Sequence, residues 1–270
     1  MSKYAQPDRR PAVVTGASSG IGAATALTLA AAGFPVALGA RRVEKCEEVV
    51  AQIRESGGEA VAHPLDVTDE ASVAKFVEAV TADLGHIEVL VSNAGHVSPG
   101  IIHEVTTERF AAEIDLNLLG AHRLVRAIVP GMIERQRGDV LFVSSDVAVR
   151  ARPFMSSYAA GKWGLEGMAH AMQMELEGSG IRVSIVRPGP TWSEMGTDWE
   201  DESAADVLTG WIKFGLARHS HFLKPQALAD AITSVVSQPR GVHLNLVEVN
   251  PEAPLAAEGP GERSDRLEQK

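Results

Sequence analysis

A tyrosine and a lysine four residues apart form the pair in this sequence best suited to moving a proton. Tyr158 and Lys162 lie in a stretch whose pattern predicts a helix over about 156–177. Side chains at positions i and i+4 lie on one face of a helix. Because a nearby ammonium favours the phenolate, we expect Lys162 to lower the pKa of Tyr158 and make it a general acid–base near neutral pH. A pair at this spacing also occurs on ordinary protein surfaces, and that alternative stays open.

A serine is expected beside this pair. Ser145 directly follows a short apolar run at 140–144, which predicts a strand. In open α/β sheets, ligands bind at the carboxyl ends of the strands. Ser145 is therefore predicted to face that crevice and to hydrogen-bond a carbonyl oxygen of a substrate.

A glycine-rich turn, from Thr15 to Gly22, joins the first predicted strand to the first predicted helix. Its first glycine permits a tight turn, its second lets backbone N–H groups approach a pyrophosphate, and its third lets the helix pack close to the sheet. The helix N-terminus would face the phosphates. A plain structural turn has a similar pattern. The sequence nevertheless predicts a dinucleotide site that contains Gly16, Ser18, Ser19, Gly20, Ile21 and Gly22.

Two arginines follow the second predicted strand. Folds specific for NAD usually carry an acidic residue there, which binds the ribose 2′-hydroxyl. This chain has Arg41 and Arg42 instead. Guanidinium groups pair with phosphate, so the sequence favours NADP over NAD. The alternative is that both arginines are solvated residues at a helix start.

Short apolar runs alternate with amphipathic stretches along the chain, which predicts a parallel sheet with helices on both faces. We expect a doubly wound, seven-stranded, Rossmann-like sheet in one α/β domain over 1–250, with a substrate lid at about 189–223 and a mobile tail over 251–270. The lid stretch is expected to be irregular. Predicted strands cover 12–15, 35–40, 59–65, 89–93, 140–144, 182–187 and 242–249, and predicted helices cover 20–32, 43–55, 69–84, 107–134, 156–177 and 225–236.

With these motifs in order, the chain resembles the short-chain dehydrogenase/reductase family over roughly 12–249. The resemblance implies that Ser145, Tyr158 and Lys162 are catalytic, and that Lys162 also holds the nicotinamide ribose. It further implies that Asn117 holds a water in a proton relay. The implied reaction is hydride transfer between NADP(H) and a carbonyl or alcohol carbon.

The same resemblance extends the cofactor site. It implies that Asp66 and Val67 contact the adenine, and that the loop after the sixth strand lies beside the nicotinamide. Ser92 stands where the family has the first Asn of its Asn-Asn-Ala-Gly element. After the sixth strand, Thr191 and Ser193 both offer a hydroxyl to the carboxamide. The residues that complete the expected cofactor site are Asn93, Ala94, Gly95, Pro188, Gly189 and Thr191.

Composition excludes several other classes. The formal net charge of −10 argues against nucleic-acid binding, which needs a basic face. The single cysteine, Cys46, allows no intrachain disulfide and suits a reducing compartment. No apolar run is long enough for a membrane span, and no metal-like spacing of ligands occurs. We therefore expect a cytoplasmic protein without a metal site, and the resemblance implies a homo-oligomer, a tetramer or a dimer.

The sequence says least about the identity of the substrate. Five aromatic residues gather between the sixth strand and the last helix, which suits a hydrophobic ketone or aldehyde, although they could merely pack the lid. One alternative is a 3-oxoacyl-carrier-protein reductase, whose acidic partner would need a basic patch. Another is a non-catalytic nucleotide-binding regulator. The aromatic residues are Trp192, Trp199, Trp211, Phe214 and Phe222, and the candidate patch is Arg123, Arg126, Arg150 and Arg152.

Overall fold

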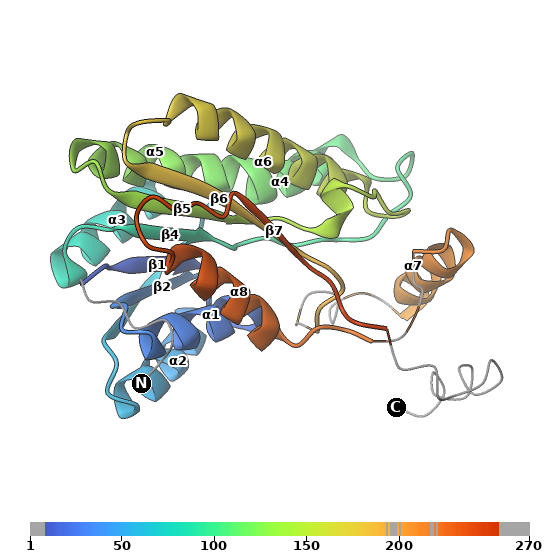
Figure 1. The fold of residues 1–270 in the computed structure, drawn as a ribbon. Coiled ribbons are helices and arrows are strands. Elements are labelled where there is room, and N and C mark those ends of the chain that lie inside the picture. The colour runs from blue at the N-terminus through green and yellow to red at the C-terminus, as the bar shows by residue number, and fades with distance from the viewer. Residues whose placement is uncertain are drawn as a thin grey trace.

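The computed structural model describes residues 9–192, 194, 199, 201–216, 219 and 221–253. In Figure 1, a parallel sheet lies between two layers of helices. The sheet has seven strands in the order β3-β2-β1-β4-β5-β6-β7, which confirms the predicted doubly wound fold. The strands are β1 (Ala12–Thr15), β2 (Val36–Ala40), β3 (Ala60–Pro64), β4 (Val89–Ser92), β5 (Gly138–Val143), β6 (Ile181–Pro188) and β7 (Leu246–Val249).

The central strands are covered on both faces. Every residue of β1, β2, β4 and β5 is buried, as expected for the short apolar runs of a parallel sheet. The strand order reverses between β1 and β4. Sheets of this kind bind ligands beside such a reversal, at the carboxyl ends of the strands.

The helices divide between the two faces (Figure 1). On one face, α1 (Gly20–Ala31), α2 (Val43–Glu55) and α8 (Pro225–Val236) bury one hydrophobic cluster, in which Cys46 is a packed residue. On the other face, α3 (Glu70–Leu84), α5 (Gly120–Glu134) and α6 (Ser156–Glu175) bury a second cluster. None of the described helices is both long and apolar enough to cross a bilayer.

Three elements differ from expectation. The predicted helix over 107–134 is α4 (Thr107–Ile114), a π-helical turn (Asp115–Leu119) and then α5. The stretch expected to be irregular contains α7 (Asp201–Lys213), and the last strand begins at Leu246 rather than at 242. Residues 242–245 are tied instead by side chains, since Arg182 donates to the Val242 carbonyl (2.7 Å) and His243 bonds the Val183 carbonyl (2.9 Å). Of the expected mobile tail, residues 254–270 lie outside the described residues.

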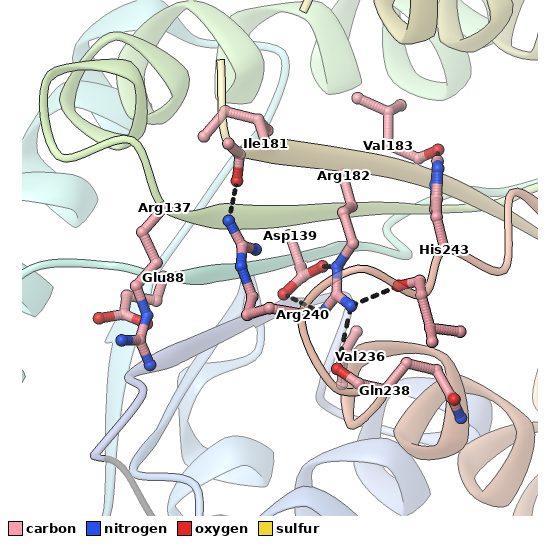
Figure 2. Close-up of polar contacts among 12 residues, drawn as sticks. Glu88, Arg137, Asp139, Ile181, Arg182, Val183, Val236, Gln238, Arg240 and His243 are labelled. Carbon is pink, nitrogen blue, oxygen red and sulfur yellow. Dashed lines mark hydrogen bonds and ion pairs between the residues drawn. The ribbon is translucent and has the colours of Figure 1, made fainter. Parts of the chain in front are cut away.

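A buried ionic cluster lies where β5 and β6 begin, at the end of the sheet opposite to the carboxyl ends of the strands (Figure 2). The Asp139 carboxylate of β5 accepts hydrogen bonds from Arg10 and, at 2.5 and 3.0 Å, from Arg182 of β6. Arg182 also donates to the Gln238 carbonyl, and Arg10 to that of Val236. These contacts attach the segment before β1 and the end of α8 to the two strands.

Candidate active site

The glycine turn after β1 is shaped by close approach of the backbone. Gly16 has a φ of 64°, and a Cβ there would lie 2.9 Å from the Ala94 Cα. A Cβ on Gly22 would lie 2.3 Å from the Gly16 carbonyl oxygen. The turn is tied to the end of β4, because Asn93 donates to the Thr15 carbonyl (2.9 Å) and the Ala94 N–H to the Thr15 hydroxyl (3.0 Å). Gly20 and Ile21 then begin α1, whose N-terminus follows this turn.

Arg42 lies beside this turn and forms an anion-binding seat with its two serines. The Arg42 guanidinium donates to the hydroxyls of Ser18 (3.1 Å) and Ser19 (3.3 Å). The same nitrogen pairs with the Glu194 carboxylate at 2.7 Å. A cation with two hydroxyls can hold either a carboxylate or a phosphate. Arg41 is exposed and is not part of the seat.

Asp66 and Val67 follow β3, next to this region. The Asp66 carboxylate accepts hydrogen bonds from the hydroxyl (2.7 Å) and the N–H (2.9 Å) of Thr68, and these two bonds lower its pKa. The positive charge of Arg41 lowers that pKa further. Val67 is buried, and its carbonyl accepts from Arg123 (3.2 Å).

Asn117 lies in the π-helical turn with its side chain fully engaged. Its amide nitrogen donates to the carbonyls of His96 (2.8 Å) and Glu113 (2.9 Å), and its oxygen accepts from the His96 N–H (3.2 Å). The predicted role of holding a relay water therefore cannot use this amide nitrogen as the side chain stands. Instead, Asn117 braces the loop that carries Gly95.

Tyr158, Ser145 and Lys162 converge at the carboxyl end of β5. Tyr158 and Lys162 are buried on one face of α6, and the Ser145 side chain lies beside the Tyr158 hydroxyl, close enough to affect its pKa. The Lys162 ammonium lies 5.6 Å from the centre of the Tyr158 ring and donates to the Val143 carbonyl at 2.8 Å. Because both side chains are buried, the surface alternative for the pair does not describe this structure.

The pKa of Tyr158 differs from the expectation. Burial raises it to about 12, although the Ser145 side chain opposes the rise. Burial also lowers the pKa of Lys162 to about 8, against the opposing effect of the Glu166 carboxylate. The predicted net lowering of the tyrosine pKa is therefore not found, because burial dominates and Lys162 donates its hydrogen bond to the Val143 carbonyl rather than to the phenol.

An apolar cluster surrounds the tyrosine. Trp199 and Trp211 pack against it from the stretch after β6, and the Trp199 indole donates to the Val97 carbonyl at 3.0 Å. Two of the five aromatic residues thus adjoin Tyr158, whereas Trp192 and Phe222 pair with each other at 4.9 Å. The buried members of the cluster are Val97, Val147, Met155, Tyr158 and Val207.

The end of β6 is held against β7. The Gly189 N–H donates to the Val249 carbonyl at 2.8 Å, directly after Pro188. The Thr191 hydroxyl donates to the Gly189 carbonyl at 2.8 Å, so it is engaged within its own loop. The competing candidate, Ser193, lies outside the described residues.

Sequence reasoning missed two acidic side chains that organise the site. Glu113, buried on α4, accepts hydrogen bonds from the Ser98 N–H and from the hydroxyl of Ser157, next to Tyr158. Glu166, buried on α6, accepts from Ser144 (2.6 Å) and pairs with Arg187 (2.7 Å). The sequence held a signal for Glu113, because this residue lies four positions before Asn117 and therefore on the same face of the predicted helix.

A polar pair lies beside the apolar cluster. Arg152 pairs with the Asp146 carboxylate, and its guanidinium carbon lies 4.3 Å above the Trp211 ring. Burial raises the pKa of Asp146, and Arg152 opposes that rise. No group of three or more metal-ligating side chains occurs among the residues with described positions.

Comparison with known proteins shows which family this chain resembles. The sequence profile of the short chain dehydrogenases matches residues 10–204. A 2,3-dihydro-2,3-dihydroxybenzoate dehydrogenase of Bacillus subtilis is 34% identical over 235 residues, which cover 85% of this chain and 90% of that protein. A 3-oxoacyl-[acyl-carrier-protein] reductase of Thermotoga maritima is 34% identical over 225 residues, 83% of this chain and 89% of the reductase.

A longer protein and a solved structure are also similar. A glycine betaine reductase of Emericella nidulans is 35% identical over 243 residues, 89% of this chain but only 18% of that enzyme. The crystal structure of a metagenomic short-chain oxidoreductase in complex with NADP superposes with a TM-score of 0.75 at 33% identity, covering 90% of this chain and 97% of that one.

Proposed function

The chain belongs to the short-chain dehydrogenase/reductase family and is an oxidoreductase acting on CH–OH/C=O groups, and we propose that it uses NADP(H) to interconvert a hydrophobic ketone or aldehyde and its alcohol. The observation that carries this proposal is the Tyr158 hydroxyl, which lies beside Ser145 and belongs to an apolar cluster. A hydroxyl pair in apolar surroundings suits a substrate with one carbonyl and an apolar body.

The residues of the crevice fit a phosphorylated dinucleotide. A Cβ at Gly16 or Gly22 would collide with the end of β4 or with the turn itself, so these glycines allow the tight turn and the close packing of α1 that a dinucleotide site of this kind needs. Arg42, Ser18 and Ser19 form a seat that already accepts an anion. We expect the 2′-phosphate there, the adenine near Asp66 and Val67, and the nicotinamide near Gly189 and Thr191. The solved relative that binds NADP supports the same preference.

The chemistry follows from the positions of three side chains. When bound, the reduced nicotinamide supplies the hydride that the carbonyl carbon accepts. The hydroxyls of Ser145 and Tyr158 hold the carbonyl oxygen, and Tyr158 donates its proton to that oxygen as the charge develops. The positive charge of Lys162, 5.6 Å from the ring centre, offsets only part of the cost that burial places on the tyrosinate that remains. Alcohol oxidation is the reverse, with tyrosinate as the base.

Cofactor preference can be tested on three proteins. NADPH and NADH would be titrated into wild type, Arg42→Ala and Arg41→Ala, with turnover measured on a panel of apolar ketones and aldehydes. We expect tighter binding of NADPH by wild type, and a loss of that preference mainly in Arg42→Ala, because Arg42 forms the seat. Equal use of NADH and NADPH by wild type would contradict the NADP proposal.

A 3-oxoacyl-carrier-protein reductase is the second candidate, favoured by the similarity to such an enzyme. Such an enzyme needs a basic patch to dock its acidic partner, and the contacts of the candidate arginines argue against one. Arg123 pairs with Asp115 (2.7 Å) and Arg152 with Asp146, and Arg126 has an exposed acidic neighbour, Glu70 (3.5 Å), so three of the four arginines have a carboxylate beside them. Faster turnover of an acyl thioester than of free ketones would favour this candidate.

Two further expectations stay predictions. A non-catalytic regulator would keep its biological role in a Tyr158→Phe variant that has lost all turnover. A homo-oligomer is expected from the family, and α6 carries two exposed apolar side chains, Trp163 and Met174, that a partner subunit could cover. Light scattering of the purified protein measures the oligomeric state.

A further inference from the structure

An acidic side chain of this chain already lies in the seat proposed for the cofactor's 2′-phosphate. Glu194 comes from the loop after β6, 152 positions along the chain from Arg42. Its carboxylate accepts a hydrogen bond from Arg42 at 2.7 Å, and that same Arg42 nitrogen donates to the hydroxyls of Ser18 and Ser19. One internal anion therefore contacts the cation on which discrimination between NADP and NAD is proposed to rest.

Carboxylate and phosphate are alternatives for one guanidinium. Both accept short, charge-assisted hydrogen bonds from arginine, and both compete for the same donors. Hydrogen bonds from Arg42 and then Ser19 hold the pKa of Glu194 below its usual range, so it remains an anion at neutral pH. A 2′-phosphate that approaches Arg42 meets a like charge until Glu194 moves away.

We infer that Glu194 is a specificity-determining residue that competes with the 2′-phosphate for Arg42 and so limits the preference of the enzyme for NADP over NAD. The inference rests on the proposed NADP(H) function. A ligand that must displace an internal group has its affinity reduced in proportion to the fraction of molecules in which that group has left the seat. A nucleotide with a free 2′-hydroxyl has no such anion to place, so its affinity does not carry this penalty.

The expected effect is modest because the pair is exposed. The side chains of Arg42 and Glu194 each retain 55% of their accessible surface. Exposed ion pairs are weak, and removal of the competitor should tighten binding of a 2′-phosphate by about two- to fivefold at low salt. The effect should shrink as salt screens the pair.

Binding of nucleotide fragments to the unliganded protein tests this without turnover. Adenosine 2′-monophosphate and adenosine 5′-monophosphate would be titrated calorimetrically into wild type and Glu194→Gln. Glu48→Gln is the matched control, because it removes the same charge from the exposed face of α2, where Glu48 pairs with Lys45 (3.1 Å) rather than with Arg42. We expect Glu194→Gln to tighten the 2′-monophosphate about two- to fivefold, to leave the 5′-monophosphate unchanged, and to exceed Glu48→Gln.

The outcomes separate this inference from the function on which it rests. Unchanged 2′-monophosphate affinity in Glu194→Gln, an effect matched by Glu48→Gln, or equal tightening of both nucleotides would overturn the competition. These results would leave the proposed function intact if Arg42→Ala still weakened the 2′-monophosphate. If Arg42→Ala had no effect on either nucleotide, the seat itself would be wrong, and the NADP assignment would fail with it.

Discussion

A single methyl group at Gly95 should damage catalysis while leaving the fold in place. A Cβ there would lie 2.7 Å from the Asn117 amide oxygen and 3.7 Å from the Lys162 ammonium. The first distance is shorter than van der Waals contact allows, so either the loop or Asn117 must move. Gly95→Ala therefore tests whether the close fit of this loop against Asn117 and Lys162 supports activity.

The size of the effect follows from what holds Asn117. Its amide makes three hydrogen bonds, to the His96 carbonyl, the Glu113 carbonyl and the His96 N–H. Losing or stretching some of these should cost about 1–3 kcal/mol of the free energy of unfolding, at roughly 1 kcal/mol for each bond. Misplacement of a positioning group by about 1 Å can cost about 100-fold in rate, so we expect kcat to fall by about 10- to 100-fold.

Gly167 supplies the matched control. It lies on α6 with Tyr158 and Lys162, and a Cβ there would meet no atom within 4 Å. Gly167→Ala should raise stability by about 0.5–1 kcal/mol through helix propensity and leave turnover unchanged. Urea unfolding and steady-state turnover would be measured on both variants. Wild-type kcat and stability in Gly95→Ala would refute the reasoning.

Three other predictions test separate parts of the structure. Asp139→Asn should lower the free energy of unfolding by about 3 kcal/mol or more, because it leaves Arg10 and Arg182 without their buried anion. The molecules that remain folded should keep the wild-type kcat, and an unchanged midpoint of urea unfolding would contradict this prediction. With a Tyr158 pKa of about 12, carbonyl reduction should persist to alkaline pH while alcohol oxidation rises with pH as tyrosinate forms, and pH–rate profiles that run in the opposite directions would count against Tyr158 as the acid. Glu113→Ala should lower kcat about tenfold because it releases Ser98 and Ser157, with partial recovery in Glu113→Gln, and equal kcat in all three proteins would exclude the positioning role.

The sheet was predictable because its signals are local. Short apolar runs specify buried parallel strands, and caps such as Asp69, which accepts from the Ala71 N–H at 2.9 Å, mark helix starts. The π-helical turn was not predictable, because its residues fit a helical pattern. There the Asn117 side chain bonds the backbone of His96, on a different segment. The helix α7 was missed within a stretch rich in aromatic residues that was expected to be irregular.

The sequence predicted which residues form the site better than it predicted their pKa values. Spacing alone placed Tyr158 and Lys162 on one helix face, and strand ends placed Ser145 near them. Their pKa values depend on burial, which arises only when α6 packs against the sheet and the Val97–Val207 cluster. Glu194 could not be assigned from sequence, because its contact with Arg42 joins distant segments through one exposed side chain.

The central claim is that Tyr158 transfers the proton in an NADP(H)-dependent reduction. The most direct measurement compares wild type with Tyr158→Phe, following NADPH consumption with an apolar ketone that wild type reduces, alongside NADPH binding by fluorescence. The account predicts that turnover falls by about 100-fold or more while NADPH affinity changes little, because the phenol hydroxyl supplies the proton. Turnover by Tyr158→Phe close to that of wild type would contradict it.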